Sequence, residues 1–138
     1  MLQENRVDDV EGFVASALEA LNGRDPDALA ALGHPDAEFT SVLASTEGRV
    51  YRGRDGWRDY FRDIEETFVD FAWGLEEIVG WGGDDLVVIS RLTGRGRASG
   101  APVEVSLATV WSFREGKPWR GITYSSKDDA LEAAGLSE

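Results

Sequence analysis

The spacing of the apolar residues changes once along this chain, and the change restricts the fold more than any other sequence feature. Up to about residue 68, large apolar residues recur every three or four positions, as on the buried side of a helix. From residue 73 onward they form four extended segments separated by glycine-containing turns, which is typical of antiparallel strands joined by hairpins. Helices followed by a run of strands indicate an α+β fold.

Three helices are expected in the first half of the chain. The first covers residues 7–22 and ends at Asn22. The second begins after Asp25, a good N-cap residue, and has Pro26 at its first position. The third runs from about residue 55 to residue 68. Its packing face consists of large side chains at helical spacing: Trp57, Tyr60, Phe61, Ile64 and Phe68.

The strands should pair into a curved sheet. They are expected at residues 37–43, 73–81, 86–95, 102–113 and 119–124. In the fourth of these segments the odd-numbered positions carry the larger apolar side chains and should face the helices, so the even-numbered positions should face outward. The even-numbered residues Ala108 and Val110 suit contact with a second copy of the chain.

A short helix is expected near the C-terminus. Ser126, followed three residues later by Asp129, resembles a capping box, in which a side chain accepts a hydrogen bond from the first turn of the helix. Gly135 can adopt the left-handed conformation that ends a helix, and Leu136 can make the accompanying apolar contact. This helix should close off the sheet.

The composition excludes several kinds of site. The chain has 138 residues, no cysteine and one histidine, which excludes disulfides, zinc–thiolate centres and cysteine nucleophiles. Its glycines mark turns and form no phosphate-binding loop, so no metal and no cofactor is expected. A net charge of −12 disfavours nucleic acid and membrane surfaces as partners. With no long apolar run and no signal-peptide pattern, residues 1–138 are expected to form one cytoplasmic domain.

Several segments, taken in order, are similar to those of one protein family. They are residues 22–29 at the first helix corner, 34–39 at the first strand, 51–57 before the third helix, 110–117 in the penultimate hairpin, and 119–136. Together they resemble the SnoaL-like branch of the nuclear transport factor 2 superfamily. The resemblance implies a cone-shaped α+β barrel, with three N-terminal helices packed on a curved mixed, mostly antiparallel sheet and a short C-terminal helix. It also implies a small-molecule pocket and a homodimer formed through the outer sheet face.

Members of this family include isomerases, cyclases, hydrolases and dehydratases, so the fold alone does not define a reaction. The three catalytic positions of ketosteroid isomerase fall on Ala17, Ser41 and Thr109, and none of these carries the required acid, base or phenol. Arg91 could replace the arginine of limonene epoxide hydrolase, but the last strand has no acid to complete that relay. SnoaL-type cyclases use an acidic residue, for which Glu38 is the available first-strand carboxylate.

The candidate catalytic residues are therefore Glu38 and His34. Glu38 could be a pocket acid or base, or a solvated strand carboxylate, because a one-residue register shift would reverse its direction. His34 could be a general base or occupy a surface corner, and Arg91 could bind an anion or be ion-paired. Trp57 is expected mainly in the core. The candidate ligand-binding residues are Phe39, Ser41, Tyr60, Arg91, Thr109, Trp111, Thr123 and Tyr124.

Two functions remain open from the sequence. The first is binding of a small hydrophobic molecule. It includes cofactor-free isomerase, cyclase or dehydratase (lyase) chemistry on a polyketide- or terpenoid-like compound if Glu38 or His34 acts as acid or base. The second is a non-catalytic, dimeric ligand-binding or interaction module of the same fold. This second function predicts a pocket filled by its own side chains, or a pocket without a titratable group.

Overall fold

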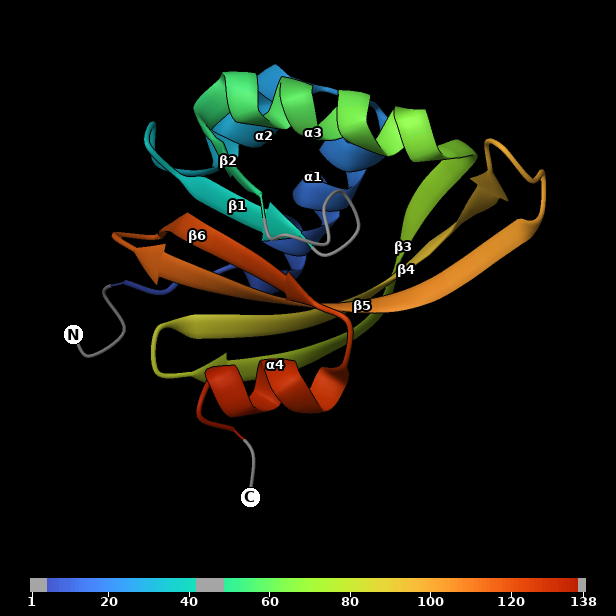
Figure 1. Cartoon of the computed structure of the whole chain (residues 1–138). Coiled ribbons are helices and arrows are strands. Elements are labelled where there is room, and N and C mark those ends of the chain that lie inside the picture. Colours follow the sequence, from blue (N-terminus) through green and yellow to red (C-terminus); the bar gives the residue numbers. More distant parts are fainter. Residues whose placement is uncertain (1–4, 42–48, 137–138) are drawn as a thin grey trace.

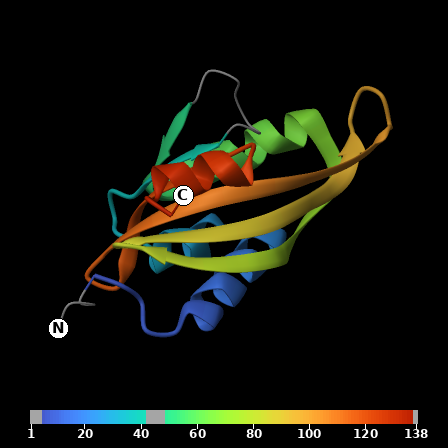
Figure 2. The ribbon, with the colours of Figure 1, turned by 90° about the horizontal axis from the view of Figure 1, so that it is seen from below.

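A computed structural model describes residues 5–41 and 49–136 of the chain. Its helices are α1 (Val10–Asn22), α2 (Pro26–Leu32), α3 (Gly53–Thr67) and α4 (Lys127–Ala133). Its strands are β1 (Glu38–Ser41), β2 (Val50–Arg52), β3 (Phe68–Gly82), β4 (Asp85–Gly96), β5 (Pro102–Arg114) and β6 (Lys117–Tyr124). The first three helices cover one face of a curved sheet (Figure 1), and α4 lies against the other face (Figure 2). This arrangement confirms the predicted α+β fold.

Side-chain caps set where the first two helices begin. Asp9 accepts a hydrogen bond from the backbone N–H of Gly12 at 2.9 Å, so α1 begins directly after Asp9 and not at residue 7. Asp25 accepts a hydrogen bond from the N–H of Ala28 at 3.1 Å, and Pro26 is the first residue of α2, as the sequence predicted. None of the helices in the described part of the chain is long and apolar enough to cross a membrane.

The strands pair in the order β2-β1-β6-β5-β4-β3. Among the described strands only β1 and β6 run parallel, so the sheet is mixed and mostly antiparallel, as predicted. β2 and β3 form the two edges, and the sheet curves beneath the helices without closing on itself. Irregularities in the pairing of β3 with β4 contribute to this curvature, because a bulge bends the strand that contains it.

Two strands differ from the sequence-based expectation. β2 has three residues, which is too short for a period-two pattern to appear in the sequence. β3 begins at Phe68, which has an extended backbone and caps the end of α3, so the strand starts directly where the helix stops. The predicted end of the first strand at residues 42–43 lies outside the described residues.

The two faces of the sheet carry separate apolar cores. Leu107 belongs to the inner core, which packs beneath α1, α2 and α3. Ala108 and Val110 belong to the outer core, where they pack with Ala130 and Ala134 at the C-terminal helix α4. The odd- and even-numbered residues of β5 therefore face the sides that the sequence predicted. Because α4 of the same chain covers Ala108 and Val110, a second copy of the chain would need a different part of this face.

The C-terminal helix has the predicted caps. Ser126 Oγ accepts a hydrogen bond from the backbone N–H of Asp129 at 3.1 Å. At the other end Gly135 has a φ angle of 75°, in the left-handed region. The backbone N–H of Leu136 then donates to the carbonyl of Leu131 at 2.8 Å, as in a Schellman motif. These bonds stop α4 at the edge of the outer core.

The corner between α1 and α2 is bound to the open edge of the sheet at β3. The Asn22 side chain donates to the carbonyl of Trp73 at 2.9 Å and accepts from its N–H at 2.8 Å. Arg24 Nη2 donates to the carbonyl of Phe71 at 2.5 Å, and its guanidinium lies 3.8 Å from the centre of the Phe71 ring. Burial lowers the pKa of this guanidinium from its usual value. We call Asn22 and Arg24 the corner clamp, because together they hold α1 over the sheet.

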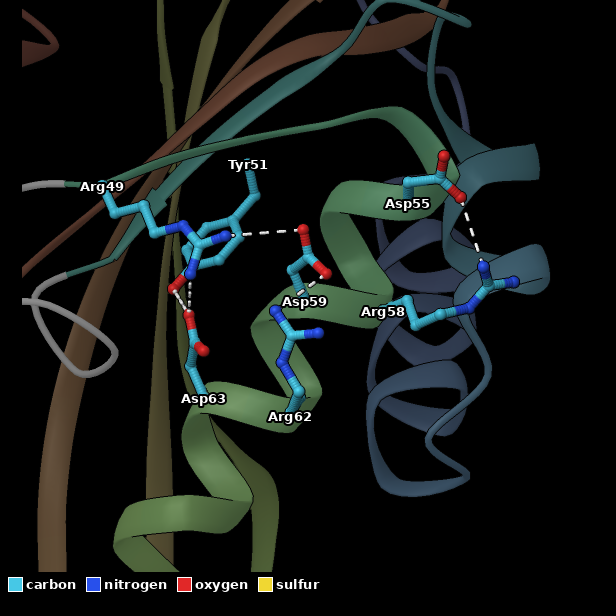
Figure 3. Close-up of polar contacts among 7 residues, drawn as sticks. All are labelled: Arg49, Tyr51, Asp55, Arg58, Asp59, Arg62 and Asp63. Atoms are coloured by element: carbon cyan, nitrogen blue, oxygen red, sulfur yellow. Dashed lines mark hydrogen bonds and ion pairs between the residues drawn. The ribbon is translucent and has the colours of Figure 1, made fainter.

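A polar network attaches β2 to the surface of α3 (Figure 3). Arg49, which directly precedes β2, pairs with Asp63 at 2.6 Å and with Asp59 at 3.4 Å. The Tyr51 hydroxyl donates to the same Asp63 oxygen at 2.6 Å. The helix presents an Arg-Asp dipeptide every four residues: Arg54-Asp55, Arg58-Asp59 and Arg62-Asp63. Most of these charges are exposed and stabilise the fold little, so Tyr51 and Asp63 form the significant part of the network.

The Tyr51 bond makes stability depend on pH. Burial and the hydrogen bond to Asp63 raise the pKa of the Tyr51 hydroxyl above its usual value of 10.0. Because the unfolded chain then releases this proton more easily, the stabilisation is complete below pH 10 and is lost as the pH rises further. We expect the free energy of unfolding to fall more steeply between about pH 9 and 11 in the wild type than in Tyr51→Phe. The free energies are measured by urea unfolding at each pH. If they fall equally steeply with pH in the wild type and in Tyr51→Phe, the prediction is wrong.

Candidate ligand-binding site

Two small adjoining cavities lie between the helical layer and the inner face of the sheet. We call them the large chamber, of about 50 Å³, and the small chamber, of about 30 Å³. Each exceeds the roughly 10–15 Å³ that one water molecule needs, and each is far below the roughly 300 Å³ of a small drug-binding pocket. Their walls share five residues: Phe13, Ala17, Phe39, Trp57 and Trp111.

The remaining walls come from different elements in the two chambers. The large chamber lies under α1 and over the middle of the sheet, and its other residues are Val14, Leu18, Leu21, Tyr60, Trp73, Val88, Ser90, Leu107, Thr109 and Thr123. The small chamber lies near α2 and the first residues of β1 and β6, and its other residues are Leu29, Leu32, Gly33, Ala37, Glu38, Pro118, Arg120 and Gly121.

Phe39 of β1 is the centre of an aromatic cluster that fills most of the space between the layers. Its ring centre lies 4.7 Å from that of Trp57 and 5.0 Å from that of Tyr60, both on α3. On the sheet side it stacks with Trp111 at 5.9 Å, and Phe13 of α1 meets Trp111 edge-on at 5.9 Å. These are ordinary distances for packed aromatic rings. The chambers are therefore the spaces that this cluster leaves open.

Gly121 of β6 allows the Trp111 ring to take its position. Trp111, Gly121 and Phe39 are neighbours across β5, β6 and β1 in the strand register. A Cβ atom added at Gly121 would lie 2.7 Å from Cζ3 of Trp111 and 3.2 Å from Cδ1 of Phe39. The indole therefore lies directly over the β6 backbone, where any side chain at residue 121 would displace it.

Apart from the indole N–H groups of its three tryptophans, the polar side-chain groups of the large chamber are hydroxyls. Thr109 and Thr123 are both buried, and their Oγ1 atoms form a hydrogen bond of 2.8 Å in which either can be the donor. Ser90 and Tyr60 supply the other hydroxyls of the wall. No residue that lines this chamber in the described part of the chain carries a carboxylate, an imidazole or a cationic group. The arrangement is suited to hold an uncharged ligand with a hydrogen-bonding atom.

Glu38 is the carboxylate among the described residues that line the small chamber. Alternation along β1 directs it to the side opposite Phe39, since Phe39 belongs to the inner core. Its Oε2 pairs at 3.1 Å with Arg52, its register partner on β2. Among the described residues, no group of three or more histidine, aspartate or glutamate side chains could hold a metal ion.

A match to the SnoaL-like domain covers residues 14–121, which is most of the chain and contains nearly all of both chamber walls. The chain belongs to the SnoaL-like family. The family match thus confirms the resemblance that the sequence segments indicated. No curated protein matches the chain.

Solved structures share the SnoaL-like fold at low sequence identity. An NTF2-like protein from Burkholderia thailandensis is 25% identical, with a TM-score of 0.70 over 91% of this chain and 94% of that one. IdmH from Streptomyces antibioticus, a proposed polyketide cyclase, is 23% identical, with a TM-score of 0.66 over 90% and 96%. A hypothetical protein from Catenulispora acidiphila with a ketosteroid isomerase-like fold, solved in complex with trimethylamine, is 19% identical, with a TM-score of 0.70 over 90% and 92%. These likenesses show the fold.

The structure brings together most of the predicted ligand-binding residues of this SnoaL-like domain. Those that line a chamber are Phe39, Tyr60, Thr109, Trp111 and Thr123. Ser41 pairs with Thr123 along the strands, but its side chain lies outside the described part of the structure.

Arg91, Tyr124 and His34 line neither chamber. Neighbouring residues of a strand face opposite sides, so Tyr124 cannot share the inner face with Thr123, and it packs in the outer core. Arg91 lies on the outer face for the same reason, paired with Glu76 at 3.1 Å. His34 Nε2 donates to the backbone carbonyl of Arg114 at 2.6 Å, in a surface depression that Glu38 also borders.

The sequence interpretation missed part of the wall. Trp57 belongs to the core, as predicted, but it also borders both chambers, and Trp73 was not considered for the site. The residues of α1, such as Phe13 and Ala17, also line the chambers. Their helical spacing shows that they face the sheet, but the sequence does not show where packing leaves a space.

Replacing Gly121 tests the aromatic arrangement. We expect Gly121→Ala to lower the free energy of unfolding by about 1–3 kcal/mol, because the new methyl group would overlap the Trp111 ring. Near-ultraviolet circular dichroism should report the displaced indole. Gly74→Ala is the matched control, since a Cβ there meets nothing within 4 Å. If both variants are as stable as the wild type, the Trp111 ring does not depend on residue 121.

Proposed function

We propose that this SnoaL-like protein binds a small, uncharged, largely apolar molecule in the large chamber. The observation that carries the proposal is the composition of the wall: aromatic rings and aliphatic side chains surround a buried pair of hydroxyls, without any charged side chain. An apolar wall with a few fixed polar groups is typical of sites that bind small organic molecules. A charged ligand would lose its hydration there without gaining a partner.

The hydroxyl pair specifies one feature of the ligand. Thr109 and Thr123 together have two hydroxyl hydrogens, and the bond between them uses one. The second hydrogen remains available to an acceptor atom that enters the chamber. A ligand that carries a ketone, quinone or similar oxygen would accept this hydrogen, and its flat ring could pack against Tyr60 and Trp73.

The structural relatives are compatible with such a ligand. IdmH is described as a proposed polyketide cyclase, and polyketide-like compounds combine carbonyl oxygens with apolar carbon frameworks. This likeness supports the same chemical class of ligand that the chamber wall of this chain favours.

The hydroxyl pair can be tested with two probes of the same shape. Acetophenone has a carbonyl oxygen where α-methylstyrene has a methylene group. We expect the wild type to bind acetophenone about three- to tenfold more tightly than α-methylstyrene, because only acetophenone can accept a hydrogen bond from the hydroxyl pair. Thr109→Val combined with Thr123→Val should abolish this preference, because both hydroxyls are removed and neither is left unpaired. Ligand-observed NMR titration gives both affinities.

Thr93→Val is the matched control for this experiment, because Thr93 lies across from Glu104 in the outward-facing register of β4 and β5. It should keep the preference for acetophenone. A wild type that binds both probes equally, or a double variant that still prefers acetophenone, would show that the hydroxyl pair does not contact the ligand.

A second candidate function is acid–base catalysis by Glu38. It is favoured by the position of Glu38, which is the carboxylate that borders the small chamber in the described structure. Isomerisation, cyclisation and dehydration of carbonyl compounds begin with removal of a proton from carbon, which needs a positioned base. In the structure this carboxylate pairs with Arg52, so it would have to leave that partner to reach a bound molecule.

Hydrogen exchange separates binding from catalysis. If Glu38 is a general base, the wild type should speed the exchange of the methyl hydrogens of acetophenone in D₂O by about a hundredfold or more over Glu38→Gln. NMR follows the loss of the methyl signal. Asp36→Asn is the matched control, because Asp36 is an exposed carboxylate near Glu38. If the methyl hydrogens exchange no faster with the wild type than in buffer alone, Glu38 is not a general base and the site only binds its ligand.

A further inference from the structure

Trp111 is one of five residues that line both chambers, and its position bears on the size of the ligand. We propose that Trp111 is a displaceable partition: its indole separates the chambers in the ligand-free protein, and it moves aside when a two-ring ligand occupies both. The inference rests on the proposed function, because it specifies how large a molecule the same site accepts.

Trp111 differs from the other aromatic residues that border both chambers. Phe13, Phe39 and Trp57 are buried, with 7–8% of their surface exposed. Trp111 is half-buried, although it lies in the middle of the site. The three buried rings are enclosed by neighbours on their own layers, whereas part of the Trp111 surface has no protein contact. Of the four rings that border both chambers, Trp111 is therefore the least enclosed by protein.

The contacts that hold the Trp111 ring can be exchanged for those of a ligand. Its indole N–H has no hydrogen-bond partner among the described residues. The ring is held by Phe39, with which it stacks, by the edge of Phe13, and by the backbone at Gly121. Moving it therefore breaks only dispersion contacts, which another flat ring in the same place would restore.

The volumes explain why the partition has to move. The chambers measure about 50 Å³ and about 30 Å³, whereas an engineered cavity that binds benzene measures roughly 150 Å³. Neither chamber alone has room for a two-ring molecule, and a single ring enters the large chamber only when its walls adjust. Displacement of the indole joins the two spaces and adds the volume of the indole itself, which is a two-ring system. A flat bicyclic molecule then fits where Trp111 had been.

Removing the partition tests this inference. The probe is 1-fluoronaphthalene, a neutral two-ring molecule whose binding is measured by fluorine NMR titration of the full chain. In the wild type, only those molecules in which the ring has moved aside can bind the probe, so the observed affinity is reduced in proportion to their fraction. If that fraction is about a tenth, Trp111→Ala should raise the affinity about tenfold. Trp111→Phe, which keeps a smaller ring, should raise it by less.

Two further measurements keep the test decisive. Trp81→Phe changes a tryptophan that borders neither chamber and should leave the affinity unchanged. One-dimensional proton NMR of each variant shows whether it is folded. If Trp111→Ala is unfolded, the direction of the change in Trp111→Phe decides the result.

The outcomes separate this inference from the proposed function. An affinity that is unchanged or weaker in the Trp111 variants, with the wild type still binding the probe, overturns the partition but not the ligand site. Failure of the wild type and all variants to bind either 1-fluoronaphthalene or acetophenone overturns both. A gain in the Trp111 variants together with no gain in Trp81→Phe supports the partition.

Discussion

The site depends on the hydrogen bonds by which the corner clamp, Asn22 and Arg24, attaches α1 to the open edge of the sheet at β3. A sheet that does not close leaves the backbone groups of its last strand unpaired. Asn22 uses both ends of its amide to bond the N–H and the carbonyl of Trp73, as a neighbouring strand would. Arg24 adds a bond to the carbonyl of Phe71. Together they satisfy part of the edge, and they also set the height of α1 above the sheet. That height decides whether Phe13 and Ala17 leave space above Phe39 and Trp111 or close it.

Within that space, hydroxyls line the large chamber, whereas the charged residues Glu38 and Arg120 line the small one. The hydroxyls of Thr109 and Thr123 lie inside the large chamber, whereas Glu38 pairs with Arg52 on the other side of β1. Arg91 is likewise outside, between Glu76 and Glu104. The residues that could perform proton transfer are therefore at or beyond the border of the space that could hold a ligand. This separation is the physical reason to place binding before catalysis for this member of a family that contains both.

The sequence predicted the order of most elements, both caps of α4 and the two faces of β5, because these depend on local spacing and on cap residues. It did not predict β2, whose three residues carry no period of their own. Tyr124 was assigned to the pocket together with Thr123, although strand alternation alone excludes having both on one face. Arg91 could not be placed in the same way, because its outward direction follows from its pairing with Ser106 of β5, which only the structure shows. The chambers themselves could not be predicted, because they are what remains after Phe39, Trp57 and Trp111 have packed.

The missing side chain at residue 121 has a consequence for relatives of this protein. Position 121 and position 111 share one volume, since the indole of Trp111 occupies the place of a Cβ at Gly121. A larger residue at the position of Gly121 is therefore accommodated with least strain when the residue at the position of Trp111 is smaller. The two positions should covary: the larger the residue at the position of Gly121, the smaller the residue at the position of Trp111. In a related sequence, this pair of letters alone would then indicate whether the pocket is divided or continuous.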